Sequence, residues 1–305
     1  MSRTADDSRG GDICFVTLVR SKQGEDLARI VIEGLRTFGG PLRDCTVWAF
    51  VLDRDPVSPV LPDLEGVRRL PLALDEGCPP YPFAEKVYAC ARAEEMAVRD
   101  IRSLVWISLD TLIISPPRLF DLGAAPDTPE ADVAFRPVHH RNIGSLAEEP
   151  LDDFWGAVYE ALGIPAMPHT VESFVDRQTL RPYFNSHSFA FNPALGLAQL
   201  WWDHFAALIT DKPFQAGPCS DALHKIFLHQ AILSTLVARE LAWERVRLLT
   251  PEYNYPLNLL DEIPLARRPA TLNRLVTAVY EEAFPWGETE LQEPLLSWLR
   301  QHLVT

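Results

Sequence analysis

The stretch Ser103–Ser115, which reads Ser-Leu-Val-Trp-Ile-Ser-Leu-Asp-Thr-Leu-Ile-Ile-Ser, decides the fold. An apolar run from Leu104 to Ile107 is interrupted by Ser-Leu-Asp and resumes from Leu112 to Ile114. Runs rich in Leu, Ile and Val are typical of strands buried on both faces of a sheet. A carboxylate in such a stretch is costly to bury without a partner, and a carboxylate at a strand end is a common ligand for a divalent cation. We therefore expect Asp110 either to contribute to a ligand site or to cap the following turn.

Outward from this stretch, strand-like and helix-like apolar spacing alternate along the chain. Ile13–Val19 and Thr46–Leu52 predict buried strands, and Gly24–Phe38 predicts a helix that ends at Gly39-Gly40. The same patterns predict strands at Val67–Leu70, Asp132–Val138, Arg181–Phe191 and Thr271–Val279, and helices at Phe83–Asp100, Leu151–Leu162, Leu195–Ile209, Asp221–Leu241 and Glu288–Val304. The alternation predicts an α/β fold with a largely parallel sheet and helices on both faces. We expect one domain over residues 12–305 after a mobile tail over residues 1–11.

Composition narrows the classes of partner. The chain has 305 residues, a hydrophobic content of 47% and a formal net charge of −14. Nucleic acids and anionic membranes attract Lys and Arg, so the acidic balance argues against both as general partners. Five scattered cysteines without a Cys-x-x-Cys pair predict reduced thiols in a cytoplasmic protein. The polar N-terminus predicts no signal peptide, and no apolar run is long enough to span a bilayer.

Four segments besides Ser-Leu-Asp agree in order and spacing with a known family. They are the strand and helix of residues 13–36, Phe83–Val87 (Phe-Ala-Glu-Lys-Val), Tyr183–Pro193 (Tyr-Phe-Asn-Ser-His-Ser-Phe-Ala-Phe-Asn-Pro) and His229–Leu233 (His-Gln-Ala-Ile-Leu). Together these segments resemble the GT-A glycosyltransferases, nearest to the glycogenin-like and lipopolysaccharide galactosyltransferase-like group. The resemblance covers residues 13–286. It implies a GT-A-like (Rossmann-like) domain with a central mixed, mainly parallel sheet, and a nucleotide-diphospho-sugar donor.

The chain departs from that family at the positions that hold metal and sugar. Ser108 stands where the family has the first Asp of its Asp-x-Asp motif. His187 stands for a Gly and His229 for an Asp. The late metal-binding His would fall at residues 278–281, which read Ala-Val-Tyr-Glu. The family uses Mn²⁺ or Mg²⁺, so we expect metal dependence here to be weak or unusual.

The candidate donor-binding residues follow from the position of the strand ends. Ligands of open α/β sheets bind beyond the carboxyl ends of the strands, where Thr17, Arg20 and Asp53 fall. The alternation of side chains predicts that Ser108 and Asp110 share one side of an extended segment. A Lys in the first turn of a helix is disfavoured by the dipole unless it meets an anion. We therefore assign nucleotide and sugar binding to Thr17, Arg20, Lys86, Ser108, Asp110 and Arg141.

The histidines are the candidates for catalysis. Asn185 and His187 are expected on one side of a strand, and His229 and Gln230 on a buried helix, where adjacent residues point about 100° apart. A neutral His could act as the general base for an acceptor hydroxyl. Two imidazoles and a carboxylate, from His187, His229 and Asp110, would suit a transition metal if they converged. A lone His on a buried helix is otherwise most often a hydrogen-bonded core residue.

Three functions remain open at this stage. The first is a hexosyl-type glycosyltransferase that passes a sugar from a nucleotide-diphospho-sugar to an unidentified acceptor. The second is a catalytically inactive relative that binds a nucleotide-sugar or a protein partner. The third is the same scaffold turned to other metal-based or His-based chemistry.

Overall fold

The structure is a computed structural model that describes residues 12–52, 64–74, 77–97, 101–125, 127–164, 166–281, 284–287 and 290–303. The tail expected over residues 1–11, the candidate Asp53 and the expected helix end at 98–100 lie outside the described residues.

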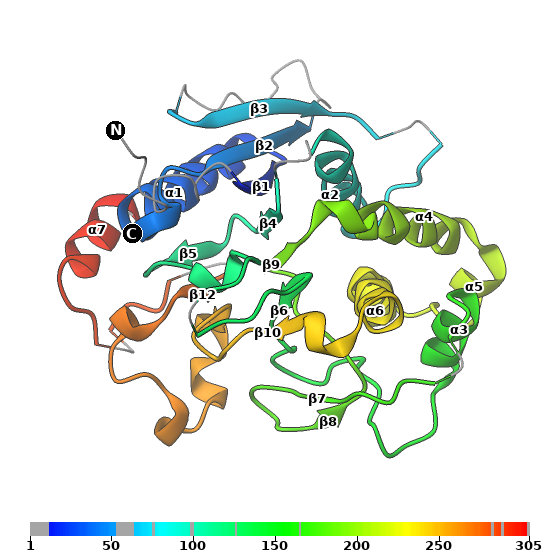
Figure 1. The fold of residues 1–305 in the computed structure, drawn as a ribbon. Helices are drawn as coiled ribbons and strands as arrows, with labels where there is room; N and C mark the ends of the chain where they lie inside the picture. Colours follow the sequence, from blue (N-terminus) through cyan, green and yellow to red (C-terminus); the bar gives the residue numbers. More distant parts are fainter. Residues whose placement is uncertain are drawn as a thin grey trace.

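Seven of the described strands form one twisted main sheet (Figure 1). These strands are β1 (Ile13–Val19), β2 (Thr46–Leu52), β3 (Val67–Leu72), β4 (Ser103–Ile107), β6 (Val133–Phe135), β9 (Ser188–Phe191) and β10 (Val246–Leu248). Their order is β10-β6-β9-β4-β1-β2-β3. Neighbouring strands pair in parallel except at β9, which is antiparallel to both β4 and β6. The sequence-based prediction of a mixed, mainly parallel sheet is confirmed.

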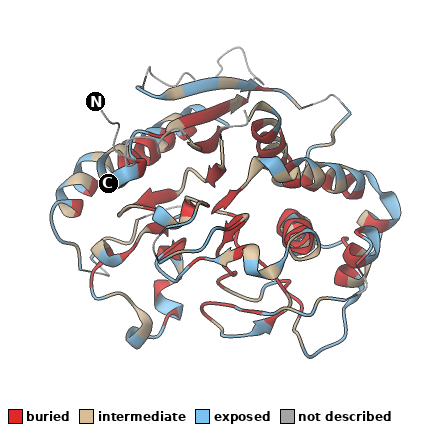
Figure 2. Cartoon of the chain, in the orientation of Figure 1, coloured by how far each residue is buried: buried red, intermediate tan, exposed pale blue. Residues whose placement is uncertain are grey.

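Helices cover both faces of this sheet, because alternate strand residues point to opposite sides. On one side, Val16, Trp48 and Trp106 belong to the apolar cluster that the helices α2 (Ala84–Met96), α4 (Leu197–Thr210) and α6 (Ala222–Glu240) complete. On the other side, Phe15, Val47 and Val105 pack with Val31, Ile32 and Leu35 of α1 (Lys22–Phe38). Figure 2 shows the buried residues concentrated on the strands and on the helix faces turned toward them.

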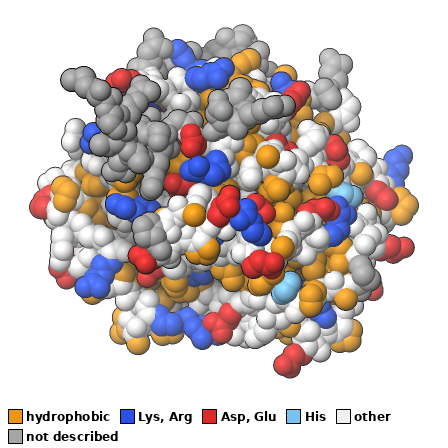
Figure 3. Space-filling model, viewed as in Figure 1, with side chains coloured by type: hydrophobic (Ala, Val, Ile, Leu, Met, Phe, Trp, Pro, Cys, Tyr) orange, Lys and Arg blue, Asp and Glu red, His pale blue; other side chains and the backbone are white. Residues whose placement is uncertain are grey.

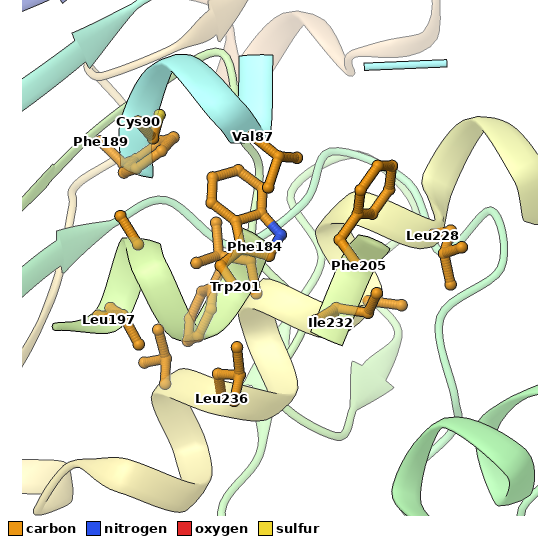
Figure 4. Packing of buried hydrophobic residues seen from close by; sticks show 14 of the residues in the cluster. Val87, Cys90, Phe184, Phe189, Leu197, Trp201, Phe205, Leu228, Ile232 and Leu236 are labelled. Atoms are coloured by element: carbon orange, nitrogen blue, oxygen red, sulfur yellow. The ribbon is translucent and has the colours of Figure 1, made fainter. Parts of the chain in front are cut away.

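The larger core lies where α2, α4 and α6 meet (Figure 4). Trp201 of α4 is 1% exposed, and its indole Nε1 donates a hydrogen bond of 2.8 Å to the His229 carbonyl of α6. Leu228 to Val237 is a continuous buried run on α6, which agrees with the prediction of a buried helix for this part, whereas residues 222–227 are exposed or half-buried. Packing against α2 and α4 therefore holds α6, and with it His229, in place.

A small second sheet lies beside the first. Its strands are β5 (Thr111–Ile113), β11 (Tyr255–Pro256) and β12 (Thr277–Val279), with β12 between the other two. Beyond it, α7 (Leu295–His302) packs on α1 through the rings of Phe38 and Trp298, whose centroids are 5.4 Å apart. The remaining regular elements are α3 (Asp153–Ala161), α5 (Lys212–Ala216) and the hairpin of β7 (Val171–Glu172) and β8 (Thr179–Leu180).

Two predictions about the strands next to the site are wrong. Residues 108–110 are not extended: they form a turn closed by a hydrogen bond of 3.2 Å from the Thr111 N–H to the Ser108 carbonyl, and the chain passes from β4 into the second sheet. Asn185 and His187 precede β9 instead of sharing a strand, because the Asn185 side-chain oxygen accepts the His187 N–H at 2.8 Å. Side chain to backbone hydrogen bonds of this kind end a strand that apolar spacing alone would extend.

The bounds of other predicted elements differ from those in the structure, but the fold is unchanged. The strand expected at 271–279 begins only at Thr277, and the helix expected at 288–304 covers Leu295–His302. Turn residues such as Asn273 and Pro294 occupy the intervening positions.

The three-helix core predicts a large effect for one substitution. Ile232 of α6 is 0% exposed, so Ile232→Ala leaves a cavity and should lower the free energy of unfolding by about 2–5 kcal/mol. Leu265→Ala, at a residue 80% exposed, is the control and should change it by less than about 0.5 kcal/mol. Urea unfolding of both variants measures the difference, and equal losses would contradict the described packing.

Candidate donor-binding pocket

A pocket of about 330 Å³ lies beyond the carboxyl ends of β1 and β4. Its lining residues come from the ends of these strands and from the beginnings of α1 and α2. They are Thr17, Leu18, Arg20, Ser21, Gln23, Gly24, Leu27, Phe83, Lys86, Trp106, Ser108, Leu109 and Asp110. Five of the six predicted donor-binding residues line this one pocket, as the strand-end rule predicts.

Two helices begin at this pocket. Ser21 caps α1 by accepting the Gly24 N–H on its hydroxyl oxygen at 3.2 Å. Phe83 precedes α2 in a left-handed conformation with φ 64°. Helix N-termini carry partial positive charge and unpaired N–H groups, so both favour an anion in the space between them.

Lys86 is the buried cation of the pocket. Its side chain is 4% exposed, and its ammonium donates a hydrogen bond to the Ser186 carbonyl. The rings of Phe83, Trp106 and Phe189 lie around it, with centroids 5.3 to 5.9 Å from Nζ. Burial lowers the pKa of Lys86 to about 7, since the charged form loses its hydration. Near neutral pH this lysine gains or loses its proton easily, and an anion bound beside it would favour the charged form.

Arg20 supplies a second cation at the rim. Its side chain is 47% exposed and lies 3.6 Å from the Glu85 carboxylate on the first turn of α2. This ion pair orients the guanidinium toward the pocket without burying it. The pocket therefore has one buried and one exposed cation on the same side.

Asp110 is the carboxylate of the pocket. One of its oxygens, Oδ2, lies 3.5 Å from His187 Nδ1, and Oδ1 has no hydrogen-bond partner among the described residues. Burial tends to raise the pKa of Asp110, but the interaction with His187 and the nearby Lys86 charge outweigh it and leave the pKa below the usual value. Asp110 is therefore ionised at neutral pH, and one of its oxygens is left without a partner in the described part of the chain.

The segment that the resemblance aligned with the late family His lies directly against Asp110. The Tyr280 N–H donates to the Asp110 carbonyl at 3.1 Å, next to β12. Burial raises the pKa of Tyr280 to about 12, so the phenol stays neutral. The segment that follows β12 therefore lies next to Asp110, and it carries a neutral phenol in place of a His.

No metal centre is assembled from protein ligands in the described part of the chain. No group of three His, Cys, Asp or Glu side chains there is arranged to hold a metal ion. The convergence of His187, His229 and Asp110 is therefore not formed: His187 is beside Asp110, whereas His229 is committed elsewhere. These three side chains, as the described residues place them, do not form a transition-metal site.

His229 is held on both ring nitrogens inside the core. Nδ1 lies 2.9 Å from the Ile226 carbonyl, so it must carry the proton, and Nε2 accepts the Ser186 hydroxyl at 3.0 Å. The ring also stacks on Phe83 with centroids 4.2 Å apart. Burial, followed by the Lys86 charge, lowers the pKa of His229 well below its usual value, so the imidazole is neutral. With these contacts, His229 is a structural residue behind the pocket wall.

The other predicted residues divide between the pocket and its surroundings. The Thr17 hydroxyl donates to the Ile107 carbonyl at 2.8 Å, which ties β1 to β4. Ser108 accepts the Trp106 indole N–H at 3.3 Å. The Gln230 side-chain oxygen is buried without a hydrogen-bond partner among the described residues. Arg141 lies elsewhere, because its Nε donates to the Gly144 carbonyl at 3.0 Å and it is not part of the pocket lining.

Several pocket residues were not predicted. Phe83, Trp106 and Gly24 line the pocket but were not predicted as site residues. The Ser21-x-x-Gly24 spacing was the available signal, because a Ser at an N-cap marks where a helix points its N–H groups. Gly24 also keeps the wall thin, since a Cβ there would lie 3.4 Å from Leu109.

The sequence model of a Rhodobacterales glycosyltransferase domain matches residues 53–240, so the chain belongs to this glycosyltransferase family. The matched region contains Lys86, Asp110, His187 and His229. No curated protein matches the chain. Across the described residues, no helix combines the length and apolar character needed to cross a membrane.

The buried lysine predicts an unusual pH dependence of stability. Its pKa is about 7 in the folded protein against 10.5 for a free lysine, so the unfolded chain binds more protons between these values. Stability should therefore rise with pH over this range, and the burial penalty is fully present below pH 7. Lys86→Met should remove this rise, so that its stability relative to the wild type is greatest at pH 6–7 and declines toward pH 10.

Urea unfolding at pH 6, 7, 8.5 and 10 measures this dependence. Lys212→Met is the matched control, because Lys212 is exposed and its removal should leave the pH dependence of the wild type intact. Parallel curves for the wild type and Lys86→Met would show that Lys86 keeps an ordinary pKa.

Proposed function

We propose that the protein is a GT-A glycosyltransferase of the glycogenin-like and lipopolysaccharide galactosyltransferase-like group, which transfers a hexosyl unit from a nucleotide-diphospho-sugar. One observation carries the proposal: Lys86 and Arg20 face the same pocket as the N-termini of α1 and α2. All four features favour an anion, and the donor's diphosphate is the anion that this family would bring. The five free cysteines support a reducing, cytoplasmic compartment.

In this proposal the diphosphate lies between the two helix starts. As the glycosidic bond to the donor breaks, negative charge develops on the departing diphosphate. Lys86, held by the Ser186 carbonyl and three aromatic rings, is already in position and needs no rearrangement. Such preorganised charge is the main way enzymes stabilise a leaving group.

The acceptor side is assigned to His187. Its side chain is 29% exposed, and its Nδ1 faces Asp110, which leaves Nε2 as the nitrogen that could take a proton from an acceptor hydroxyl. Asp110 would orient the ring and stabilise the imidazolium, as a carboxylate does behind a catalytic His. Asn185 fixes the loop through the His187 N–H, and the buried Gln230 side-chain oxygen, which has no hydrogen-bond partner among the described residues, is assigned to sugar binding in this proposal.

A divalent cation has a limited place in this scheme. Asp110 Oδ1 is a carboxylate oxygen without a protein partner, and Ser108 lines the same pocket, so one carboxylate and one hydroxyl are available. A hard cation such as Mn²⁺ or Mg²⁺ prefers six oxygen ligands or more. The donor's phosphates would have to supply most of them, and the scheme above does not depend on the ion.

A second candidate is a relative that binds the donor without transferring the sugar. The commitment of both His229 nitrogens and the neutral Tyr280 beside Asp110 favour it, because positions that carry ligands in the family carry structural groups here. Donor hydrolysis separates the two, since an inactive relative binds the nucleotide-sugar and leaves it intact. Other metal-based chemistry has weaker support, because the ligands do not converge.

Donor binding is tested with UDP-, GDP- and dTDP-sugars. One of them should raise the unfolding midpoint, and calorimetry should show Lys86→Ala to bind it about 1–3 kcal/mol more weakly, the range for a charged hydrogen bond. Affinity should fall above pH 7, because the lysine must take up a proton to meet the anion. Lys212→Ala is the control, and an unchanged affinity in Lys86→Ala would remove Lys86 from the site.

Metal binding gives an independent test. The apo protein should bind Mn²⁺ more weakly than micromolar, and Asp110→Asn should abolish what binding there is, because Asp110 is the only carboxylate among the described residues that line the pocket. Titration followed by Mn²⁺ paramagnetic resonance measures both forms. Micromolar binding that persists in Asp110→Asn would place a metal site elsewhere in the protein.

A further inference from the structure

A second pocket, of about 360 Å³, shares no lining residue with the donor pocket. It lies beyond the carboxyl end of β6, between the β7–β8 hairpin and the segment that precedes β11. Three arginines and two glutamates line it, together with Ser173, Phe174 and Pro251; the charged residues are Arg136, Glu172, Arg177, Glu252 and Arg267.

Arg136 is the unusual member of this set. It is 6% exposed, and its Nε is buried without a hydrogen-bond partner among the described residues. Its guanidinium lies 4.9 Å from the centre of the Phe174 ring. Burial lowers the pKa of Arg136 to about 10, so it still carries its charge at neutral pH. A buried charge without a paired counter-charge is costly, and proteins retain one where a ligand supplies the missing partner.

The neighbouring charges do not neutralise Arg136. Arg177 pairs with Glu172 at 2.9 Å, which removes one charge of each sign. Arg267 lies 5.5 Å from the centre of the same Phe174 ring and donates to the Phe174 and Val175 carbonyls, which hold it in place without cancelling its charge. Glu252 is exposed and raises the pKa of Arg136 by its charge, but it forms no ion pair with Arg136 among the described contacts, so two cations share one aromatic ring with one exposed carboxylate beside them.

We propose that this pocket binds an oxyanion, a carboxylate or a phosphate ester of a small ligand, between the guanidinium groups of Arg136 and Arg267 and against Phe174. Arginine presents paired N–H donors that match the two oxygens of such a group. Phe174 would contact the apolar part of the ligand, and the exposed Arg177–Glu172 pair also lines the pocket.

The pocket opens at the same edge of the sheet as the donor pocket. The Arg136 carbonyl accepts the Asn185 N–H at 2.7 Å, and Asn185 in turn holds His187, which faces Asp110. Only β9 separates β6 from β4, so the two strand ends are roughly 10 Å apart at the usual strand spacing. An acidic sugar in the second pocket would therefore lie within reach of His187, although the anion site itself does not depend on transfer activity.

Calorimetry of the full chain with sodium phosphate and with sodium glucuronate, at ionic strength held constant with chloride, tests the proposal. Saturable binding of at least one probe is expected, with none for glucose. Stronger binding of glucuronate than of phosphate would assign the site to an acidic sugar, and the reverse to a phosphate group. Absence of saturable binding for both would overturn the proposal.

Variants separate this pocket from the donor pocket. Arg136→Met should weaken binding at least tenfold, whereas Arg68→Met, which removes an exposed arginine from the Trp48 ring at the other end of the sheet, should not. Lys86→Ala should keep the anion site. Loss of binding in Lys86→Ala together with full binding in Arg136→Met would place the anion in the donor pocket and overturn the proposal.

One further variant guards against a folding defect in Arg136→Met. Glu252→Gln removes an exposed carboxylate from the same pocket and leaves the backbone bonds of residue 252 intact. It should tighten anion binding at least twofold, because the competing negative charge is gone. Unchanged or weaker binding in Glu252→Gln would contradict the charge balance on which the site rests.

Discussion

The hydrogen bond from the buried Lys86 ammonium to the Ser186 carbonyl is the interaction on which the donor pocket depends. Ser186 also donates its hydroxyl to His229, and His229 stacks on Phe83, which begins the helix that carries Lys86. The contacts thus form a closed ring through α2, α6 and the loop before β9. Lys86, Ser186 and His229 are buried and Phe83 is half-buried, so a shift of any one of them would disturb the contacts of the others. Among the described residues, these contacts hold Lys86, whose pKa is lowered, in one position in the pocket wall.

The same ring explains why two histidines in one site region differ in character. His229 lies within the ring and is neutral with both nitrogens occupied. His187 is one residue beyond the ring, partly exposed, and faces the ionised Asp110. His187 keeps a ring nitrogen that could exchange a proton with a ligand. Both ring nitrogens of His229 are occupied, so His229 only holds the pocket wall in shape. Both histidines lie within residues 53–240, the part of the chain that the family model matches.

Much of the scaffold could be predicted because it rests on apolar spacing. β1 and β2 have the bounds that their apolar runs indicated, and the buried run of α6 was visible as a helix apolar all round. The pocket residues Thr17, Arg20 and Lys86 followed from the rule for strand ends and from a misplaced charge at a helix start. The turn at 108–110 and the Asn185 side-chain bond could not be predicted, since each depends on one hydrogen bond across a loop. The sequence did not indicate a binding role for Arg136. Its guanidinium Nε lacks a hydrogen-bond partner among the described residues, and this is evident only in the folded chain.

The reversed direction of β9 has a consequence for how this protein can change. In a parallel strand the residues at the ligand edge follow the strand, but β9 runs the other way, so Asn185, Ser186 and His187 precede it. The register of Ser188–Phe191 between β4 and β6 is set by the strand itself. The residues immediately upstream, Tyr183 and Phe184, are 0% exposed and pair with the segment that follows β6. Figure 3 shows basic and acidic side chains intermixed on the viewed face. His187 is partly exposed, so substitutions there can alter the edge of the pocket without shifting the register of the sheet.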